Sequence, residues 1–435
     1  MNIKTLTLLP GLTLIGALIN TQAWSANWLS LQGTEKSGSS SRAKVWGFIQ
    51  PEYTRTDGTK LKAGPSSGKN MAPNMARPDN KSTETFNIRR ARIGIRGTGF
   101  PLDDKVNYFF LAEFGNNGIT KPAKTGVQIT DASITLNHIA GARVRVGQFK
   151  TPTAEEGLQA IHVFNYINFT SVTDQMMLER FTNGDGTGTD ANGLNGSVGA
   201  FRDIGIQVFN TFKSTDWEHS YALMYGNGNG IARTDNDDNK ETYIYWSSEL
   251  VFGGKGARRE GLKMFAWNQS GKRTLTTAGA GEYDRTRNGL GFTLLKGKYR
   301  AAAEYMTADG MIFNGSDGGG VPGSTDNGGN IVSLNVLTND KADGYYLDFG
   351  YKVIPKLELD IRYDVLNRGT ETNAGERTFD TITLGAQYFL NKKSRITINY
   401  EIRNQDAPGF AGSAPPNQIA DSLDDRLSLQ LLAIF

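Results

Sequence analysis

The chain has 435 residues, of which 52 are Gly and 13 are Pro. Lys and Arg number 47 against 44 Asp and Glu, and this near balance excludes the strongly basic surface of a typical nucleic-acid-binding protein. Cys is absent, which excludes disulfide frameworks, thiolate nucleophiles and Cys-ligated metals. His occurs only three times, which argues against a His-rich metal site. No apolar run reaches about 18 residues, so a bundle of transmembrane helices is excluded. We expect no metal and no cofactor.

Residues 1–26 have the pattern of a secretory signal peptide. Lys4 supplies the positive charge, and residues 6–19 form an apolar stretch of suitable length. Small residues at the two ends of the segment 23–25 fit a cleavage site, with Ala26 as an alternative end. The other interpretation of this segment is a short buried helix. Export without Cys favours a bacterial envelope protein.

The dominant pattern of the remaining chain is a period of two. In residues 357–365 every second residue is apolar, and the residues between them are Glu, Asp or Arg. Residues 381–390 and 395–403 also place apolar residues at every second position. One apolar face and one polar face are the signature of a β-strand that is covered by different surroundings on its two sides.

We expect about sixteen such strands, with lengths that match tilted membrane strands rather than the ~5–6 residues of soluble ones. In chain order they lie near residues 45–56, 85–99, 105–116, 127–139, 142–150, 197–213, 217–228, 240–253, 261–271, 282–297, 299–313, 342–355, 357–369, 379–391, 394–405 and 424–435.

The predicted connections are alternately short and long, which is typical of an outer-membrane barrel. A sheet in hydrocarbon must close on itself to pair its backbone groups. We therefore predict an all-β fold, a transmembrane antiparallel β-barrel over residues 45–435. An even strand number puts both termini on the short-turn side, so residues 27–44 are expected to form a short periplasmic segment. The alternative is a large soluble β-sandwich or β-helix.

The longest connection, residues 151–196, is expected to narrow the pore. Sixteen strands enclose a lumen that side chains of the barrel alone cannot fill. Residues 158–178 within this connection are rich in apolar and aromatic side chains, which favours folding inward as a constriction loop. The alternative is a lid or a trimer contact outside the barrel.

Cationic side chains fall on the predicted inner face of two strands, and one of them, Arg89, is out of step with the alternation and is expected at a bulge or at the membrane rim. Arg and Lys that line a pore attract anions, and a guanidinium can bind them bidentately. The predicted anion-binding residues are Arg89, Arg90, Arg92, Arg96, Arg143, Arg145 and Lys150. The alternative is that lumen arginines pair with lumen acids such as Glu113, Asp131, Glu358 and Asp360.

Four short segments resemble the phosphate-selective porin family, of the outer-membrane porin O/P type. They are VWGFIQ at 45–50, FNIRRARI at 86–93, VGQFKTP at 146–152 and LER at 178–180. The resemblance implies a sixteen-stranded trimeric porin with a loop folded into the pore and an arginine ladder. The arginine pair of the family falls on residues 89 and 90.

The constriction loop departs from the family pattern. Phosphate-specific members carry a lysine in this loop, but the matching stretch 157–160 here reads Gly-Leu-Gln-Ala. Residues 151–178 contain no Lys or Arg, and they carry Glu155, Glu156 and Asp174, which we predict to line the constriction. An acidic constriction would oppose the passage of an anion.

We expect a passive porin of the Gram-negative outer membrane that admits small hydrophilic solutes and prefers anions, phosphate or similar. The alternative function is a general or other-solute-specific porin without phosphate selectivity. A barrel enzyme or adhesin is a third hypothesis, but no nucleophile motif surrounds His162 or Ser171. Expected partners are small anions, outer-membrane lipid and two further copies in a homotrimer, with no nucleic acid.

Overall fold

The computed structural model describes residues 27–31, 42–57, 60, 62–63, 67–68, 83–99, 103–120, 126–178, 199–231, 235, 237–254, 259–275, 281–313, 336–422 and 424–435. The predicted signal peptide and the last part of the predicted constriction loop, residues 179–196, lie outside the described residues. None of the helices in the described part of the chain has both the length and the hydropathy needed to cross a membrane.

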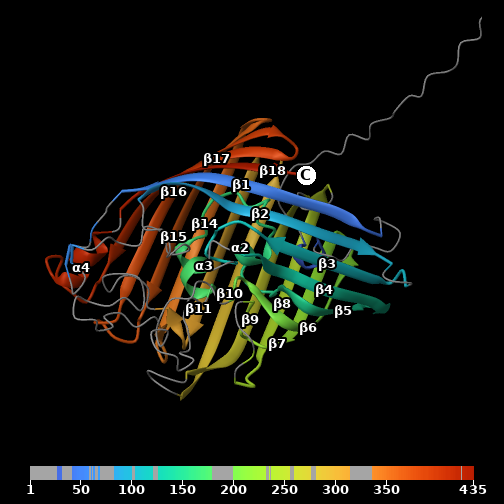
Figure 1. Cartoon of the computed structure of the whole chain (residues 1–435), viewed down its shortest axis with the longest axis horizontal. Helices are drawn as coiled ribbons and strands as arrows, with labels where there is room; N and C mark the ends of the chain where they lie inside the picture. The colour runs from blue at the N-terminus through green and yellow to red at the C-terminus, as the bar shows by residue number, and fades with distance from the viewer. Residues whose placement is uncertain are drawn as a thin grey trace, which may run out of the picture.

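Sixteen strands of the described chain close into one antiparallel barrel, in which β1 pairs with β18 to complete the ring (Figure 1). They are β1 (Lys44–Thr56), β2 (Glu84–Thr98), β3 (Val106–Glu113), β4 (Gln128–Ile139), β5 (Ala142–Lys150), β6 (Arg202–Ser214), β7 (Trp217–Gly226), β8 (Glu241–Gly253), β9 (Glu260–Leu275), β10 (Gly281–Lys296), β11 (Tyr299–Asp309), β14 (Lys341–Ile354), β15 (Leu357–Arg368), β16 (Arg377–Asn391), β17 (Ser394–Asp406) and β18 (Arg426–Ile434). A separate two-stranded sheet pairs β12 (Ile312–Phe313) with β13 (Val336–Leu337). The predicted sixteen-stranded barrel is confirmed.

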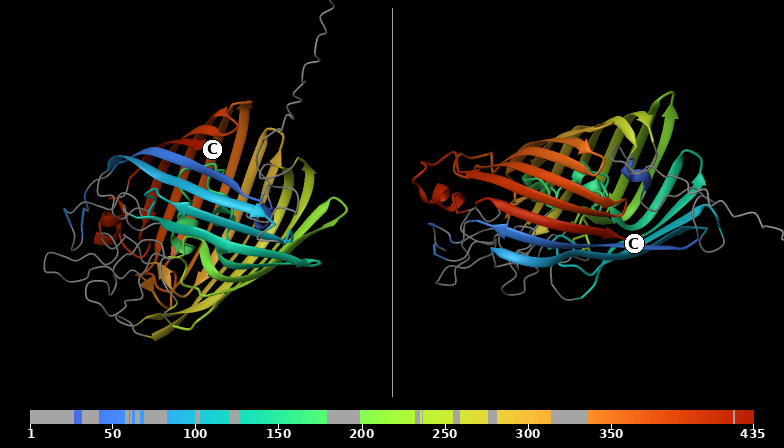
Figure 2. Two further views of the ribbon diagram at one scale, coloured as in Figure 1. Left: turned by 45° about the vertical axis from the view of Figure 1, so that its right-hand side comes forward. Right: turned by 90° about the horizontal axis from the view of Figure 1, so that it is seen from above.

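Four short helices accompany the described strands: α1 (Trp28–Leu31), α2 (Glu155–Leu158), α3 (Ser171–Met176) and α4 (Pro415–Ala420). The ribbon views show α2 and α3 enclosed by the ring of strands, and α4 beyond one end of it (Figures 1 and 2). The barrel therefore has an occupied interior.

Side chains alternate between the two faces of the barrel wall as the sequence predicts. In β15, Leu359 and Ile361 point outward and are 48% and 46% exposed. Glu358, Asp360 and Arg362 point inward and are buried. The outer face is thus apolar, as hydrocarbon requires, and the inner face carries the charges.

The connections are short at one end of the barrel and longer at the other. The turn between β4 and β5 has two residues, Ala140 and Gly141, and Gly141 adopts φ +78°, a left-handed conformation that costs glycine little. The connection between β5 and β6 runs from residue 151 to residue 201. Its described part, residues 151–178, is named the inner loop below.

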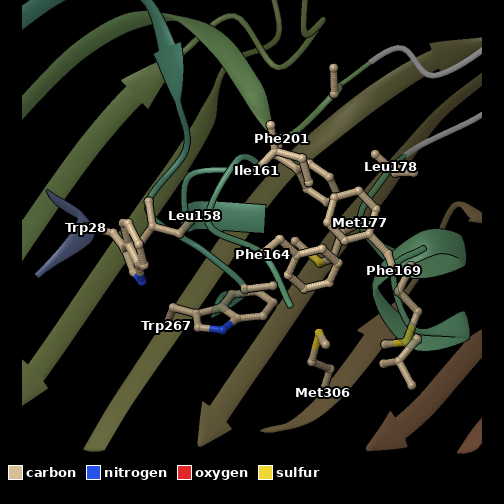
Figure 3. Close-up of a cluster of buried hydrophobic side chains, with 14 of the residues drawn as sticks. Trp28, Leu158, Ile161, Phe164, Phe169, Met177, Leu178, Phe201, Trp267 and Met306 are labelled. Carbon is tan, nitrogen blue, oxygen red and sulfur yellow. The ribbon is translucent and has the colours of Figure 1, made fainter. Parts of the chain in front are cut away.

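The inner loop carries a hydrophobic core into the lumen. The ring of Phe169 lies between Phe164 and Phe201, with ring centroids 5.1 Å and 5.0 Å away (Figure 3). Phe164 and Leu158 belong to the same buried cluster as Trp267 of β9. Burying these apolar side chains against the wall stabilises the inward position, so the predicted inward fold is confirmed for residues 151–178.

The expected periplasmic segment needs a correction for its first residues. Helix α1 lies inside the barrel, where Trp28 is 4% exposed and packs in the hydrophobic cluster of the inner loop. Figure 3 shows its ring beside Leu158. The side chain of Asn27 donates to Thr211 and Ser220 on the inner face of the wall at 2.8 Å and 2.5 Å. An indole buries a large apolar surface, and the inner loop offers an apolar site that the periplasm does not.

Candidate functional site

The two adjacent acids of the inner loop are paired with cations of the barrel wall. Lys263 of β9 donates to both carboxylate oxygens of Glu155 at 2.7 Å, and the indole Nε1 of Trp28 donates to Oε1 at 3.0 Å. Arg362 of β15 donates to Oε1 of Glu156 at 3.0 Å. All of these side chains are buried. The charge of each acid is therefore balanced by a buried partner instead of standing open in the pore.

Further hydrogen bonds pin the inner loop to the same side of the barrel. The hydroxyl of Tyr166 donates to Asp348 of β14 at 2.6 Å. The backbone N–H of Ile167 donates to Asn399 of β17 at 2.8 Å, and the Asn168 amide donates to Glu401 of β17 at 2.8 Å. The loop thus lies against the wall formed by β9 to β17. The third predicted constriction acid, Asp174, lies half-buried in α3.

An open cavity of about 250 Å³ lies on the opposite side of the inner loop, between it and strands β1 to β6. Four cationic side chains and one carboxylate reach it, together with apolar and aromatic residues. Its lining consists of Trp28, Trp46, Phe48, Arg92, Arg96, Phe109, Leu111, Asp131, Lys150, Ala160, Ile161, His162, Val163 and Arg202. Glu155 and Glu156 instead line a cavity of about 40 Å³ on the other side of the loop. We name the larger space the cationic cavity.

Three of the seven predicted anion-binding residues meet in the cationic cavity. Arg96 lies over the ring of Trp46, with 5.5 Å between its Cζ and the centroid. Arg92 donates through Nε to Glu113 at 2.7 Å. Lys150 donates to the carbonyls of residues 157, 158 and 159 at 2.8, 3.4 and 2.5 Å, so its ammonium anchors the inner loop and contributes charge to the cavity.

The arginine pair within β2 lies at a bulge, one of the two positions expected for Arg89. The pairing with β1 shifts between Gln50 and Pro51, so that Arg89 and Arg90 both turn inward and are buried. Arg89 donates to Glu52 at 3.0 Å, and Arg90 donates to Gln50 at 3.2 Å. Neither residue lines the cationic cavity.

The remaining two predicted residues lie along β5 and also do not line the cavity. Arg145 lies over the rings of Phe149 and Phe209, and it donates to the carbonyl of Leu29 in α1 at 3.4 Å. Arg143 is partly buried, two residues nearer the start of the strand. Arg145 thus holds the N-terminal helix against the wall.

The structure also contains functional residues that the sequence patterns did not single out. Arg202 follows the undescribed part of the loop, lines the cationic cavity and donates to Asp131 at 3.0 Å. Lys263 and Arg362 hold the loop acids. Alternation within the predicted strands 261–271 and 357–369 already places these two cations on the inner face, but no sequence signal connects them to residues 155 and 156.

Pairing of lumen arginines with lumen acids, the alternative considered above, occurs at each acid named there. Glu113 binds Arg92 and Asp131 binds Arg202. Arg300 donates to Glu358 at 2.9 Å and to Asp360 at 2.5 Å, and it also contacts Asp348. These pairs hold the guanidinium groups in place and reduce the excess of positive charge.

Burial, reinforced by the nearby positive charges of Lys150 and Arg92, lowers the pKa of His162 in the inner loop to about 3. Its imidazole is therefore neutral near pH 7. In the described residues no group of three or more His, Asp or Glu side chains is placed to hold a metal ion.

The sequence matches the family described as phosphate-selective porin O and P over residues 69–408. The chain belongs to this family. Its site is accordingly that of a channel of the Gram-negative outer membrane and not that of an enzyme. No curated protein matches this porin.

Solved structures similar to this porin are themselves outer-membrane channels. The outer membrane channel DcaP of Acinetobacter baumannii is 14% identical over 93% of this chain and 100% of that chain, with a TM-score of 0.51. An anion-selective porin from Comamonas acidovorans is 14% identical over 90% and 99%, with a TM-score of 0.51. OmpF of Salmonella typhi is 13% identical over 90% and 97%, with a TM-score of 0.52. At these identities the likeness establishes the fold alone.

Proposed function

We propose that this porin conducts small hydrophilic solutes passively and prefers anions, phosphate or similar. The observation that carries the proposal is the separation of charge across the inner loop. Glu155 and Glu156 are neutralised against the β9 to β17 wall, whereas Arg92, Arg96, Lys150 and Arg202 surround the open cavity on the other side. An entering anion meets the cationic side of the constriction, and the local potential raises its concentration there.

The proposed anion path follows the predicted basic residues of β2 and β5. Residues of the cationic cavity form its narrow part, and the other basic residues extend the positive potential along the wall. The full set is Arg89, Arg90, Arg92, Arg96, Arg143, Arg145 and Lys150. We further propose removal of residues 1–26 on export, contact of the outer face with lipid, and assembly as a homotrimer, which the family resemblance supports.

A second candidate function is a channel without phosphate selectivity. The pairing of Arg92, Arg202 and Arg89 with carboxylates favours it, because paired guanidinium groups retain less net charge for an anion. The described inner loop also contributes no lysine of its own.

The reversal potential of the purified protein in a planar bilayer under a KCl gradient tests the proposal. We expect anion preference, a smaller preference in Arg96→Gln, and block of the chloride current by added phosphate. Lys272→Gln is the matched control, because Lys272 lies half-exposed on the outer side of β9, where it contacts Glu282 at 2.5 Å. Cation preference of the wild type would refute the proposal, and anion preference without phosphate block would favour the second candidate.

A further inference from the structure

We propose that the cationic cavity selects small organic carboxylates with a flat apolar body, such as a single aromatic ring, over inorganic anions. This inference rests on the proposed function of anion conduction and names the solute class that the same site favours. The inference is based on the apolar lining of the cationic cavity, which a channel for inorganic anions does not need.

The wall of the cationic cavity is apolar at positions where a porin interior is normally polar. Alternation in β1 places Trp46 and Phe48 on the inner face, and alternation in β3 does the same for Phe109 and Leu111. All four side chains line the cavity. The lumen of a water-filled barrel is generally polar. Here apolar groups border the cavity, and a solute with an apolar body would displace water from them.

The aromatic rings of this wall form one continuous patch. The ring centroids of Trp46 and Phe48 are 6.2 Å apart with an angle of 27° between their planes, and the ring of Phe109 lies 6.2 Å from that of Trp46. The neutral ring of His162 faces them from the inner loop, at 5.5 Å from Trp46 and 5.2 Å from Phe48. Flat rings bind other flat rings in stacked or edge-to-face arrangements, so the patch suits a planar solute.

An arginine guanidinium lies over each of two rings in the patch. Arg96 lies over Trp46 at 5.5 Å, and Arg92 lies over Phe48 at 5.8 Å. A carboxylate bound at these guanidinium groups would place its attached ring on the neighbouring aromatic patch. Charge and apolar surface thus adjoin on one wall, as the carboxylate and the ring adjoin in an aromatic acid.

The size of the cavity and the state of its lysine also bear on the choice. About 250 Å³ is smaller than the ~300–1,000 Å³ typical of sites for drug-sized molecules, so the cavity suits a small solute. The hydrogen bonds of Lys150 go to loop carbonyls, so it provides charge but no donor. A tetrahedral phosphate would leave the apolar patch in water.

Block of the chloride current in planar bilayers distinguishes these solutes. Benzoate, acetate, phosphate and the uncharged benzyl alcohol are added to the wild-type channel in KCl. We expect benzoate to block at a concentration at least about tenfold lower than any of the other three. Equal block by benzoate and acetate would overturn the inference, because it would show that the ring contributes nothing. Equal block by benzoate and benzyl alcohol would overturn it as well, because the carboxylate would then contribute nothing.

Two variants place the effect at the patch. Trp46→Leu is expected to bring the blocking concentration of benzoate close to that of acetate. Phe379→Leu is the matched control, because Phe379 lies beneath Arg368 at 4.9 Å but does not line the cavity. Loss of benzoate block in both variants, or in neither, would contradict the assignment. The reversal potential in KCl alone separates the two proposals, because anion preference without benzoate selectivity refutes only the present one.

Discussion

The buried pair between Lys263 and Glu155 allows the charge of the constriction to be changed in either direction. At 2.7 Å and an effective dielectric constant of ~20, the two charges attract each other by about 6 kcal/mol. Desolvation offsets much of this attraction, and removing one partner of a buried pair generally costs ~3–5 kcal/mol. Lys263→Met therefore leaves a buried carboxylate without its cation, and Glu155→Gln leaves a buried ammonium without its anion.

These variants have opposite expected effects on selectivity. A unit charge acts on an ion ~4 Å away in water with ~1 kcal/mol, or about fivefold in relative permeability. This is the largest effect expected here, because Glu155 lies on the other side of the inner loop from the cationic cavity. We expect Lys263→Met to lower the chloride-to-potassium permeability ratio by at most about this factor, and Glu155→Gln to raise it. The double variant removes both charges and is expected to return within about twofold of the wild type.

Reversal potentials under a KCl gradient at about pH 8 measure the three ratios, and thermal unfolding of the same samples measures their stability. The double variant is expected to be more stable than Lys263→Met, because it contains no unpaired buried charge. Shifts of both single variants in the same direction, or no shift in either, would refute the conclusion that the wall cation neutralises the loop acid.

Two further predictions concern the contents of the lumen. Trp28→Ala removes the indole that packs on Leu158 and donates to Glu155, so we expect the unfolding free energy to fall by about 3–5 kcal/mol. We also expect a larger single-channel conductance, and an unchanged conductance would show that α1 does not restrict the pore. Burial holds the pKa of His162 at about 3, well below its unfolded value of ~6.5, so this imidazole stays neutral in the folded protein from pH ~8 to ~5. The stability associated with the neutral imidazole is fully present above pH ~6.5 and decreases as the pH falls toward 3. The change in reversal potential between these two pH values is therefore expected to be the same in wild type and His162→Gln, and a change present only in the wild type would contradict the neutral assignment.

Much of the barrel could be read from the sequence, because a membrane strand satisfies local rules. Each strand must be apolar at every second residue, so 357–365 predicts both its secondary structure and its inward charges. The closed ring then follows from the need to pair every backbone group in hydrocarbon. The bulge at Arg89 also had a local signal, since two successive arginines break the period of two.

The partners of the loop acids and the position of the N-terminal helix depended on the tertiary structure. Glu155 and Lys263 are 108 residues apart in the chain, and no local pattern encodes their contact. The sequence shows an acidic loop, which by itself argues against anions. The wall against which that loop packs is determined only in the closed barrel, because the apolar side chains of the loop and Trp28 are buried together in one hydrophobic cluster there. That packing places the acids beside Lys263 and Arg362, whereas Arg92 and Arg96 of β2 line the cationic cavity on the other side of the loop.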